Sequence, residues 1–403
     1  MKKYLFVFIS ICIVVVILVS CSKKDSYEFN IDTIDSKVTD GNLDFAFNLF
    51  KELYKEQEQK ENIVISPMSI STALSMTYNG AKGTTREGMD KTLSYNGIKK
   101  DALNESYKNL LNYFQSTEGV ELNIANSIWI REGVTVKDDF ITTNRDNYFA
   151  KIENLDFSQE DATNIINNWI SQSTKGKINK MLESPISNNV MMYLINAVYF
   201  KGQWYDKFDK NRTYEDVFYN NSNNTSKVLM MSKTSDIQYA STGNYKAIKL
   251  PYKDTSKSMY LLLPNENVTM DEFINNLNKD TWHEMKESLQ ETKDVYVKIP
   301  RFKVEYGIKD LKNVLRQLGM EEAFSESADF SGIKEGIFIN KVLHKAVIEV
   351  NEEGSEASGV TVVEMTESAQ IEPDEFIANR PFIYAIEDDK TYTLLFMGVM
   401  SHM

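Results

Sequence analysis

The segment from Glu349 to Phe382 most strongly limits what this 403-residue chain can fold into. The residues before it, Val342–Val350, alternate apolar and polar side chains as a strand does, and two strand-like runs follow at Pro381–Asp389 and Thr391–Met400. Between them lies a segment of roughly thirty residues that is acidic in composition, rich in Ser, Thr, Ala and Glu, and without a helical period. A connection of that length between strands is usually either disordered or functional.

The two faces of this segment differ when it is read as extended chain, in which alternate side chains point the same way. Both glutamates of its central part, Glu356 and Glu364, fall on one face. The other face is small and uncharged and comprises Ser355, Ala357, Gly359, Thr361 and Val363. A strand that must enter a sheet needs such a face, whereas a solvent-exposed linker does not. A chance alternation in an acidic linker is the alternative, because short alternations are weak signals.

The order of predicted elements indicates the fold class. Helical spacing of apolar residues starts at Leu43, and Ser66-Pro67 has the cap and proline of a helix start. Met191–Phe200 is almost continuously apolar, which predicts a central strand. A later helix is expected over Ile308–Leu318, closed by Gly319. Because helices crowd the first half and strands the second without regular alternation, the predicted class is α+β.

The N-terminus resembles a bacterial lipoprotein signal and is set aside from the fold. An apolar run, Tyr4–Val19, follows two lysines, and Leu18-Val19-Ser20-Cys21 resembles a lipobox. We expect residues 1–20 to be removed, Cys21 to be lipidated, and residues 21–40 to form a polar tether. The domain at 41–403 would then be exported and anchored to the bacterial cell membrane or envelope, outside the cytoplasm. A retained transmembrane anchor is the alternative, although the run is short against the roughly 20 residues that a spanning helix needs.

Charge and cysteine content exclude several classes of function. The net charge of -13 argues against a nucleic-acid-binding or heparin-binding protein. One of the two cysteines, Cys12, lies inside the signal and the other, Cys21, at its end, so the domain has no disulfide, thiolate metal site or cysteine nucleophile. The sequence also lacks the nucleophile-elbow, zinc-protease, P-loop and dinucleotide-binding motifs. We therefore expect no enzyme activity, no cofactor and no metal.

His344 is the one histidine with a candidate role. It shares the apolar face of the predicted strand with Val342, Ala346, Ile348 and Val350, so it should be buried and needs a hydrogen-bond partner. It could act as a general base. A structural histidine bonded to a neighbouring polar group is the favoured interpretation, because no nucleophile motif accompanies it.

Separate blocks of sequence, in order, resemble the serpin family over nearly all of residues 41–403. They are NIVISPMSISTALSMTYNGAKGTTREGM (Asn62–Met89), LINAVYFKGQW (Leu194–Trp204), HKAVIEVNEEGSEA (His344–Ala357), and the closing NRPFIYAI and LLFMGVM. The resemblance implies a single domain of about nine helices and three β-sheets, with an exposed reactive-centre loop inside Glu349–Phe382. It also implies a monomeric inhibitor of serine proteases. In this mechanism the cleaved loop inserts into the main sheet and traps the protease as a covalent acyl-enzyme.

The resemblance assigns roles to positions around the loop. The hinge comprises Glu352, Glu353, Gly354, Ser355, Glu356, Ala357, Ser358 and Gly359. The last three residues are small, which favours fast early insertion. The shutter, where the sheet must open, comprises Ser66, Ser69, Asn196 and His344, and gives His344 a partner in Asn196 or Ser66. The breach, where insertion starts, comprises Trp204, Arg301 and Glu352. Arg301 and Glu352 are expected to form a bidentate ion pair.

The family spacing of fourteen residues from Gly354 places the reactive bond between Ser368 and Ala369. The run onward to Pro381 is longer than the family pattern, so two other bonds compete: Met365–Thr366 and Glu367–Ser368. Neither lysine nor arginine occurs from Gly354 to Ala378, which favours an elastase-like target over a trypsin-like one. A non-inhibitory binding protein with the serpin fold is the alternative function.

Replacing the lipobox cysteine tests the expected anchor. With Cys21→Ser we expect an unprocessed precursor and loss of lipid labelling, because the lipid is carried on the cysteine sulfur. The measurement combines metabolic fatty-acid labelling with the mass of the chain. Cys12→Ser, inside the apolar run, is the matched control. Unchanged labelling and normal processing of Cys21→Ser would contradict the lipoprotein interpretation.

Overall fold

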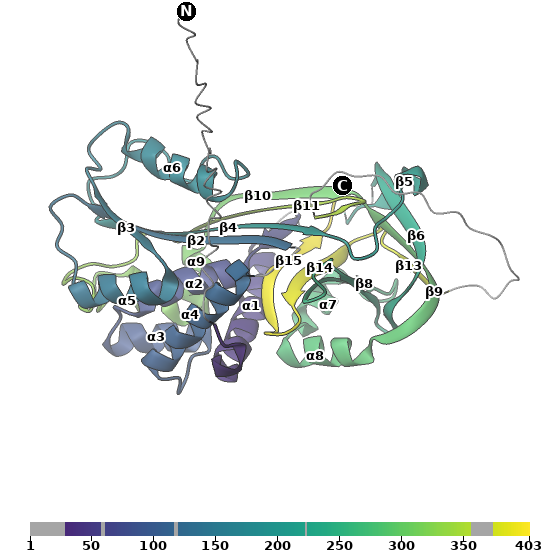
Figure 1. Cartoon of the computed structure of the whole chain (residues 1–403), viewed down its shortest axis with the longest axis horizontal. Coiled ribbons are helices and arrows are strands. Elements are labelled where there is room, and N and C mark those ends of the chain that lie inside the picture. The colour runs from purple at the N-terminus through teal and green to yellow at the C-terminus, as the bar shows by residue number, and fades with distance from the viewer. Residues whose placement is uncertain (1–28, 58–60, 117–119, 222–223, 356–373) are drawn as a thin grey trace, which may run out of the picture.

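The structure, a computed structural model, describes residues 29–57, 61–116, 120–221, 224–355 and 374–403. These residues form nine α-helices and three β-sheets, which confirms the predicted α+β class (Figure 1). The helices are α1 (Ser36–Glu56), α2 (Pro67–Tyr78), α3 (Gly83–Leu93), α4 (Lys100–Ser116), α5 (Asp138–Tyr148), α6 (Ala162–Ser173), α7 (Met270–Asn276), α8 (Lys279–Ser288) and α9 (Lys312–Leu315).

The largest sheet has nine strands. Its order is β1 (Ile63–Ile65), β15 (Thr393–Met400), β14 (Phe382–Asp388), β8 (Lys257–Pro264), β7 (Tyr245–Pro251), β6 (Thr225–Ser241), β9 (Gln290–Pro300) and β13 (Glu375–Ile377), with β5 (Thr213–Tyr219) paired to β6. β8, β14 and β15 are buried along their whole length. β14 pairs antiparallel with both β15 and β8, and the three strands form the centre of the core.

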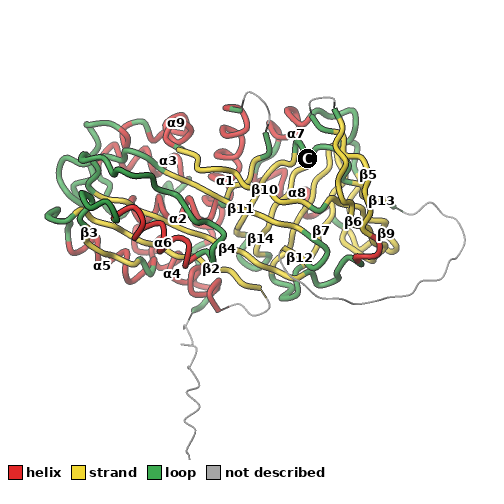
Figure 2. The backbone as a smooth tube through the Cα atoms, turned by 90° about the horizontal axis from the view of Figure 1, so that it is seen from above, coloured by secondary structure: helices red, strands yellow, loops and turns green. Residues whose placement is uncertain are grey.

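Two smaller sheets lie next to each other. One has the order β12 (Gly354–Ser355), β4 (Met192–Gln203), β2 (Val120–Arg131) and β3 (Lys151–Leu155), and the other pairs β10 (Phe302–Asp310) with β11 (Leu343–Val350). β4 and β11 contact each other (Figure 2), yet the described residues contain no hydrogen-bonded ladder between them. We call this boundary the β4–β11 seam. The short strand β12 pairs with β4 and also contacts β11, so it lies at one end of the seam.

Helices cover both faces of the sheet that contains β4. α2 and α4 pack beneath it, whereas α6 lies on its opposite face (Figure 1). The face toward α6 has its own small apolar cluster, which includes Trp129, Ile166 and Ala197. The face toward α2 belongs to the main core, to which β4 contributes Val198 and Phe200. Any strand added at the seam would therefore have one face in the core and one face toward the α6 side.

The structure differs from the sequence predictions at two elements. The helix expected over Ile308–Leu318 is wrong at its start, because residues up to Asp310 belong to β10. Phe302, Val304 and Tyr306 alternate inward there, and pairing with β11 outweighs the local helical pattern. The first helix begins at Ser36, within the segment expected to be a tether, because Val38 and its neighbours are buried against the domain. None of the helices in the described ranges has the length and apolarity needed to span a membrane.

Candidate functional site

The chain reverses direction after β11 and starts back along β4. The N–H of Asn351 donates to the carbonyl of Gly354 (2.9 Å), and Gly354 and Ser355 then pair with Gln203 and Gly202. Gly354 has φ +144°, and a Cβ atom there would lie 2.1 Å from the carbonyl oxygen of Gly202. Only glycine fits this conformation and this close approach. The hinge therefore begins with a strand already seated against β4.

The first hinge carboxylate, Glu352, is buried at 2% side-chain exposure and is fully engaged. Nη2 of Arg301 donates to both carboxylate oxygens (2.5 and 2.6 Å), and the hydroxyl of Thr213 donates to one of them (2.8 Å). The expected pair is therefore present, but one guanidinium nitrogen serves both oxygens instead of two nitrogens in parallel. Burial raises the pKa of Glu352, but hydrogen bonds from Thr213 and Arg301 outweigh it and leave the pKa below its ordinary value.

The second hinge carboxylate, Glu353, is held by two lysines. Its side chain is 4% exposed and lies 2.7 Å from Nζ of Lys207 and 3.1 Å from Nζ of Lys210. Burial raises the pKa of Glu353, but the two ammonium groups lower it by more. The pKa is therefore below its ordinary value and the carboxylate stays ionised. The hinge is thus fixed by three cations: Lys207 and Lys210 from the segment after β4, and Arg301 directly after β9.

Trp204 closes this end of the seam. Its backbone N–H donates to the carbonyl of Glu353, and its indole N–H donates to the carbonyl of Asn351, both at 2.9 Å. The indole stacks on the ring of Tyr252 with centroids 4.8 Å apart. The hydroxyl of Tyr252 is in turn 2.8 Å from the hydroxyl of Ser355. Trp204 therefore contacts the turn and, through Tyr252, the first residues of β12.

His344 is the second residue of β11, so it lies toward the end of the seam away from the hinge, and it is buried as its face in the sequence predicted. Its Nε2 accepts a hydrogen bond from the backbone N–H of Ser66 (3.2 Å), at the cap of α2. Burial lowers the pKa of His344 to about 4, so the ring is neutral near pH 7. The hydroxyl of Ser66 donates to the carbonyl of Leu395 (2.6 Å) rather than to the imidazole. This geometry fits a structural histidine, because the ring accepts from an amide and not from a nucleophile.

The other two shutter residues, Ser69 and Asn196, connect α2 to the strand on the opposite side of the seam. The hydroxyl of Ser69 donates to Oδ1 of Asn196 on β4, and Nδ2 of Asn196 donates to Oδ1 of Asn126 on β2 (2.5 Å). The first turn of α2 thus contacts β11 through Ser66 and β4 through Ser69. The two strands that share no ladder are linked through this one helix end.

Part of the predicted site lies outside the described residues. This part comprises the hinge residues Glu356, Ala357, Ser358 and Gly359, and the candidate reactive bonds at Met365, Thr366, Glu367, Ser368 and Ala369.

Sequence reasoning missed several partners of the described part of the site. These are Thr213, Lys207, Lys210 and Tyr252 around the hinge, and Asn126 next to the shutter. Thr213, Lys207 and Lys210 are ordinary polar residues between Trp204 and β6, and no local pattern marks them. The nearest usable signal was Trp204 itself, because a buried tryptophan needs a partner for its indole N–H.

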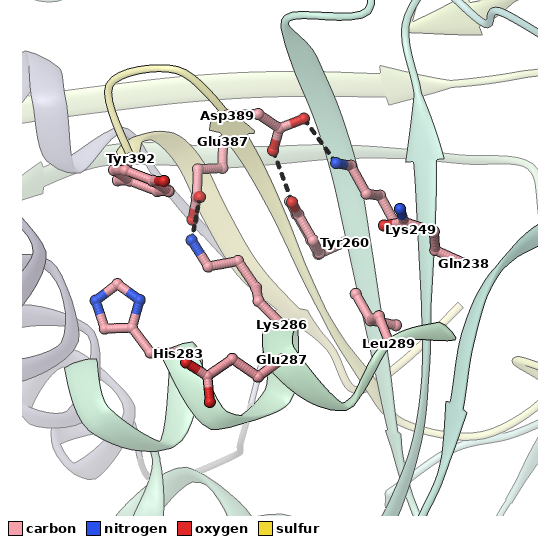
Figure 3. Close-up of a pocket in the computed structure, with 10 residues that line it drawn as sticks. All are labelled: Gln238, Lys249, Tyr260, His283, Lys286, Glu287, Leu289, Glu387, Asp389 and Tyr392. Carbon is pink, nitrogen blue, oxygen red and sulfur yellow. Dashed lines mark hydrogen bonds and ion pairs between the residues drawn. The ribbon is translucent and has the colours of Figure 1, made fainter. Parts of the chain in front are cut away.

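A pocket of about 460 Å³ lies elsewhere, between α8 and strands β7, β8 and β14 (Figure 3). Four of its charged groups form two ion pairs, Lys286 with Glu387 (2.6 Å) and Lys249 with Asp389 (3.0 Å), and Glu287 also lines it. His283 is at its edge, without a nucleophile beside it. Within the described ranges no group of three His, Cys, Asp or Glu side chains could hold a metal ion. This pocket therefore offers no catalytic arrangement.

Comparison with known proteins gives the family. The sequence profile described as Serpin (serine protease inhibitor) matches residues 40–403. Intracellular coagulation inhibitor 2 of Tachypleus tridentatus is 33% identical over 400 residues, 96% of this chain and 97% of that protein. The leukocyte elastase inhibitor of Xenopus laevis is 34% identical over 366 residues, 88% of this chain and 96% of that protein. The native-state structure of the thermophilic serpin Tengpin superposes with a TM-score of 0.83 at 34% identity, covering 92% and 95% of the two chains. The chain belongs to the serpin family.

The buried imidazole predicts a pH dependence of stability. Unfolded histidine binds a proton below its ordinary pKa of 6.5, whereas folded His344 stays neutral down to about pH 4. Protonation therefore stabilises the unfolded chain as the pH falls across this window. His344 should lower the free energy of unfolding by about 3 kcal/mol between pH 7.5 and 4. His344→Gln, which keeps an acceptor but does not titrate, should remove this part of the loss.

The measurement is the free energy of unfolding in urea at several pH values, with His283→Gln on α8 as the control. An equal loss of stability toward pH 4 in the parent and in His344→Gln would contradict the assignment.

Proposed function

We propose that this serpin is a serine protease inhibitor that acts as a suicide substrate and not an enzyme. The observation that carries the proposal is the unpaired β4–β11 seam with Gly354 and Ser355 already seated at one end. A strand edge without a partner leaves backbone donors and acceptors that a further strand can satisfy. The chain that follows Ser355 is the one best placed to supply that strand.

The described ladder sets the register of the proposed insertion. Ser355 pairs with Gly202 on β4, and the bridge between Asn351 and Gly354 sets the register on β11. In the cleaved form we propose that both ladders continue, so that the small face of the segment turns toward α2 and the core. Continued in this way from the described pairs, the proposed strand would have Ala357 between Phe200 and Ile348, Gly359 between Val198 and Ala346, and Thr361 between Asn196 and His344. The hydroxyl of Thr361 would then meet the polar groups of the shutter.

The covalent step uses the chemistry of the target protease. Its serine oxygen attacks the carbonyl carbon of Ser368, the bond to the nitrogen of Ala369 breaks, and the protease histidine gives the leaving amine its proton. The products are an ester between protease and inhibitor and a C-terminal segment with a new amino terminus at Ala369, which stays in the large sheet through β14 and β15. Insertion then carries the esterified end along the seam before water can hydrolyse the ester. The inhibitor supplies no catalytic group, only a conformational change released by the cut.

The sequence of the loop supports an elastase-like target. No lysine or arginine lies between Gly354 and Ala378, so a pocket that requires a basic side chain finds none. Ser368 and the competing Met365 suit a pocket for small or medium apolar residues. The curated relative from Xenopus laevis is itself named an elastase inhibitor, which agrees with this choice.

A non-inhibitory binding protein with the same fold is the second candidate. The uncharged face from Ser355 to Val363 disfavours it, because a loop that never inserts has no need to keep charge off one face. Mixing with a protease separates the two, since an inhibitor forms a complex that survives detergent and a mere substrate is only cut.

We also propose that the domain is displayed outside the cytoplasm on a lipid at Cys21. Two observations support this: the lipobox pattern at Leu18–Cys21, and the start of the family match only at residue 40. The residues between Cys21 and the start of the packed domain would act as a spacer that keeps the loop accessible.

Exposure to a panel of serine proteases tests the target and the bond. We expect a detergent-stable complex with an elastase-type enzyme and little or none with trypsin. Mass spectrometry of the denatured products should show a C-terminal peptide that starts at Ala369, with Thr366 or Ser368 as the next best starts. Cleavage outside Glu364–Gln370, or stable complexes with trypsin alone, would contradict the proposal.

A charge on the inserting face should convert the inhibitor into a substrate. Ser355 is 2% exposed and its hydroxyl contacts Tyr252, so Ser355→Arg would bury an unpaired cation at a cost of several kcal/mol. Cleavage should stay fast while the yield of stable complex falls at least tenfold, measured as complex formed per chain cut. Glu356→Arg, on the opposite face, is the control and should lose much less. Complex formation at parental efficiency by Ser355→Arg would contradict the assigned face.

A further inference from the structure

A patch of two tyrosines lies on the outer face of the sheet formed by β5, β6 and β9. Strand registers place Tyr214 of β5 on the same face as Tyr296 and Lys298 of β9. The two tyrosine hydroxyls are 3.3 Å apart, and the ammonium of Lys298 lies 4.7 Å from the centroid of the Tyr214 ring. Lys298 also pairs with Asp216 and is only 12% exposed, whereas Tyr214 is 44% exposed. We call Tyr214 and Tyr296 the tyrosine patch.

This patch is next to both ends of the loop. The backbone N–H of Tyr296 donates to the carbonyl of Asp374 (2.8 Å), the first described residue after the loop. The residue before Tyr214 is Thr213, whose hydroxyl donates to Glu352 in the hinge (2.8 Å). Thr213 therefore contacts one end of the loop directly, and its neighbour Tyr214 contacts Tyr296, whose backbone holds the other end. β5, β9 and β13 gather at one end of the molecule, as Figure 1 shows.

The local chemistry fits a protein contact. Tyrosine is enriched among the residues that dominate binding energy, because it buries a large ring with little loss of conformational freedom. Lys298 and Tyr296 already hold the Tyr214 ring in place, which lowers that loss further. The charges beside the patch are matched: Lys298 pairs with Asp216, and Glu375, which is in register with Tyr296, lies 3.8 Å from Lys246. The patch therefore suits a partner surface of apolar and amide groups, and its contribution should depend little on salt.

We propose that the tyrosine patch is an accessory docking surface for the target protease, beside the bond that the protease cuts. This inference rests on the proposed inhibitory function. The protease is the occupant because it binds the loop itself, and the contacts of Thr213 with Glu352 and of Tyr296 with Asp374 put the patch beside both ends of that loop.

The test measures docking and trapping separately. Docking is the affinity for an elastase-type protease whose catalytic serine is replaced by alanine, and trapping is the rate of detergent-stable complex formation with the active enzyme. Tyr214→Ala should weaken both by about tenfold, a change that corresponds to about 1.4 kcal/mol. The yield of complex per chain cut and the unfolding temperature should stay at the parental values. Tyr214→Phe should retain most of the affinity, since the ring remains.

Tyr392→Ala is the matched control. Tyr392 is 53% exposed and also lies over a lysine, with Nζ of Lys286 4.6 Å from its ring centroid, but it belongs to the turn after β14. Its replacement should change neither affinity nor rate. The ratio of parent to Tyr214→Ala should also be the same at low and high salt.

The outcomes separate the two hypotheses. Covalent trapping with equal rates for the parent and Tyr214→Ala would overturn the docking surface and leave the inhibitory function standing. Docking that depends on Tyr214, without any covalent complex, would overturn the inhibitory function and retain the surface. Absence of both docking and trapping across the protease panel would overturn both.

Discussion

The missing ladder between β4 and β11 is the constraint on which the rest of the structure depends. Adjacent strands normally satisfy each other's backbone groups, and an unpaired edge is a template for another strand. In the described residues these two strands contact each other without pairing, and the first turn of α2 is bonded to both of them. Ser66 contacts His344 on one side and Ser69 contacts Asn196 on the other. The seam is thus held in place by a polar cluster and not by the sheet itself.

The end of the seam fixes where an added strand would start. Gly354 allows the backbone to approach Gly202 so closely that no side chain could be accommodated, and Ser355 follows in register with β4. The carboxylates of Glu352 and Glu353 are tied to Arg301, Lys207 and Lys210, which keeps the turn after β11 in place. Because both neighbours of β12 have a defined register, the proposed insertion has only one alignment. In that alignment the small face of the loop meets the core.

Much of this arrangement could be predicted from the sequence. The alternation along β11 correctly placed His344 on the buried face, and Ser66-Pro67 correctly marked the start of α2. The family resemblance identified residues that the fold brings together from distant parts of the chain, such as Arg301 and Glu352.

Periodicity failed where tertiary pairing decided the outcome, as at Ile308–Asp310, which extends β10 against β11. It also could not find Thr213, Lys207 or Tyr252, because their contacts depend on how loops fold back over the hinge. The small face of the loop remains a prediction.

The unfolding temperature of the cleaved chain tests the central claim most directly. The loop would be cut by a protease that does not become trapped, and the intact and cleaved chains would be heated under the same conditions. If the cut segment enters the seam, it completes the ladders of β4 and β11, and the cleaved chain should unfold well above the intact one. Cleaved Ser355→Arg, in which insertion is blocked, should show no such rise. A cleaved parent chain that unfolds at the same temperature as the intact one would contradict the account.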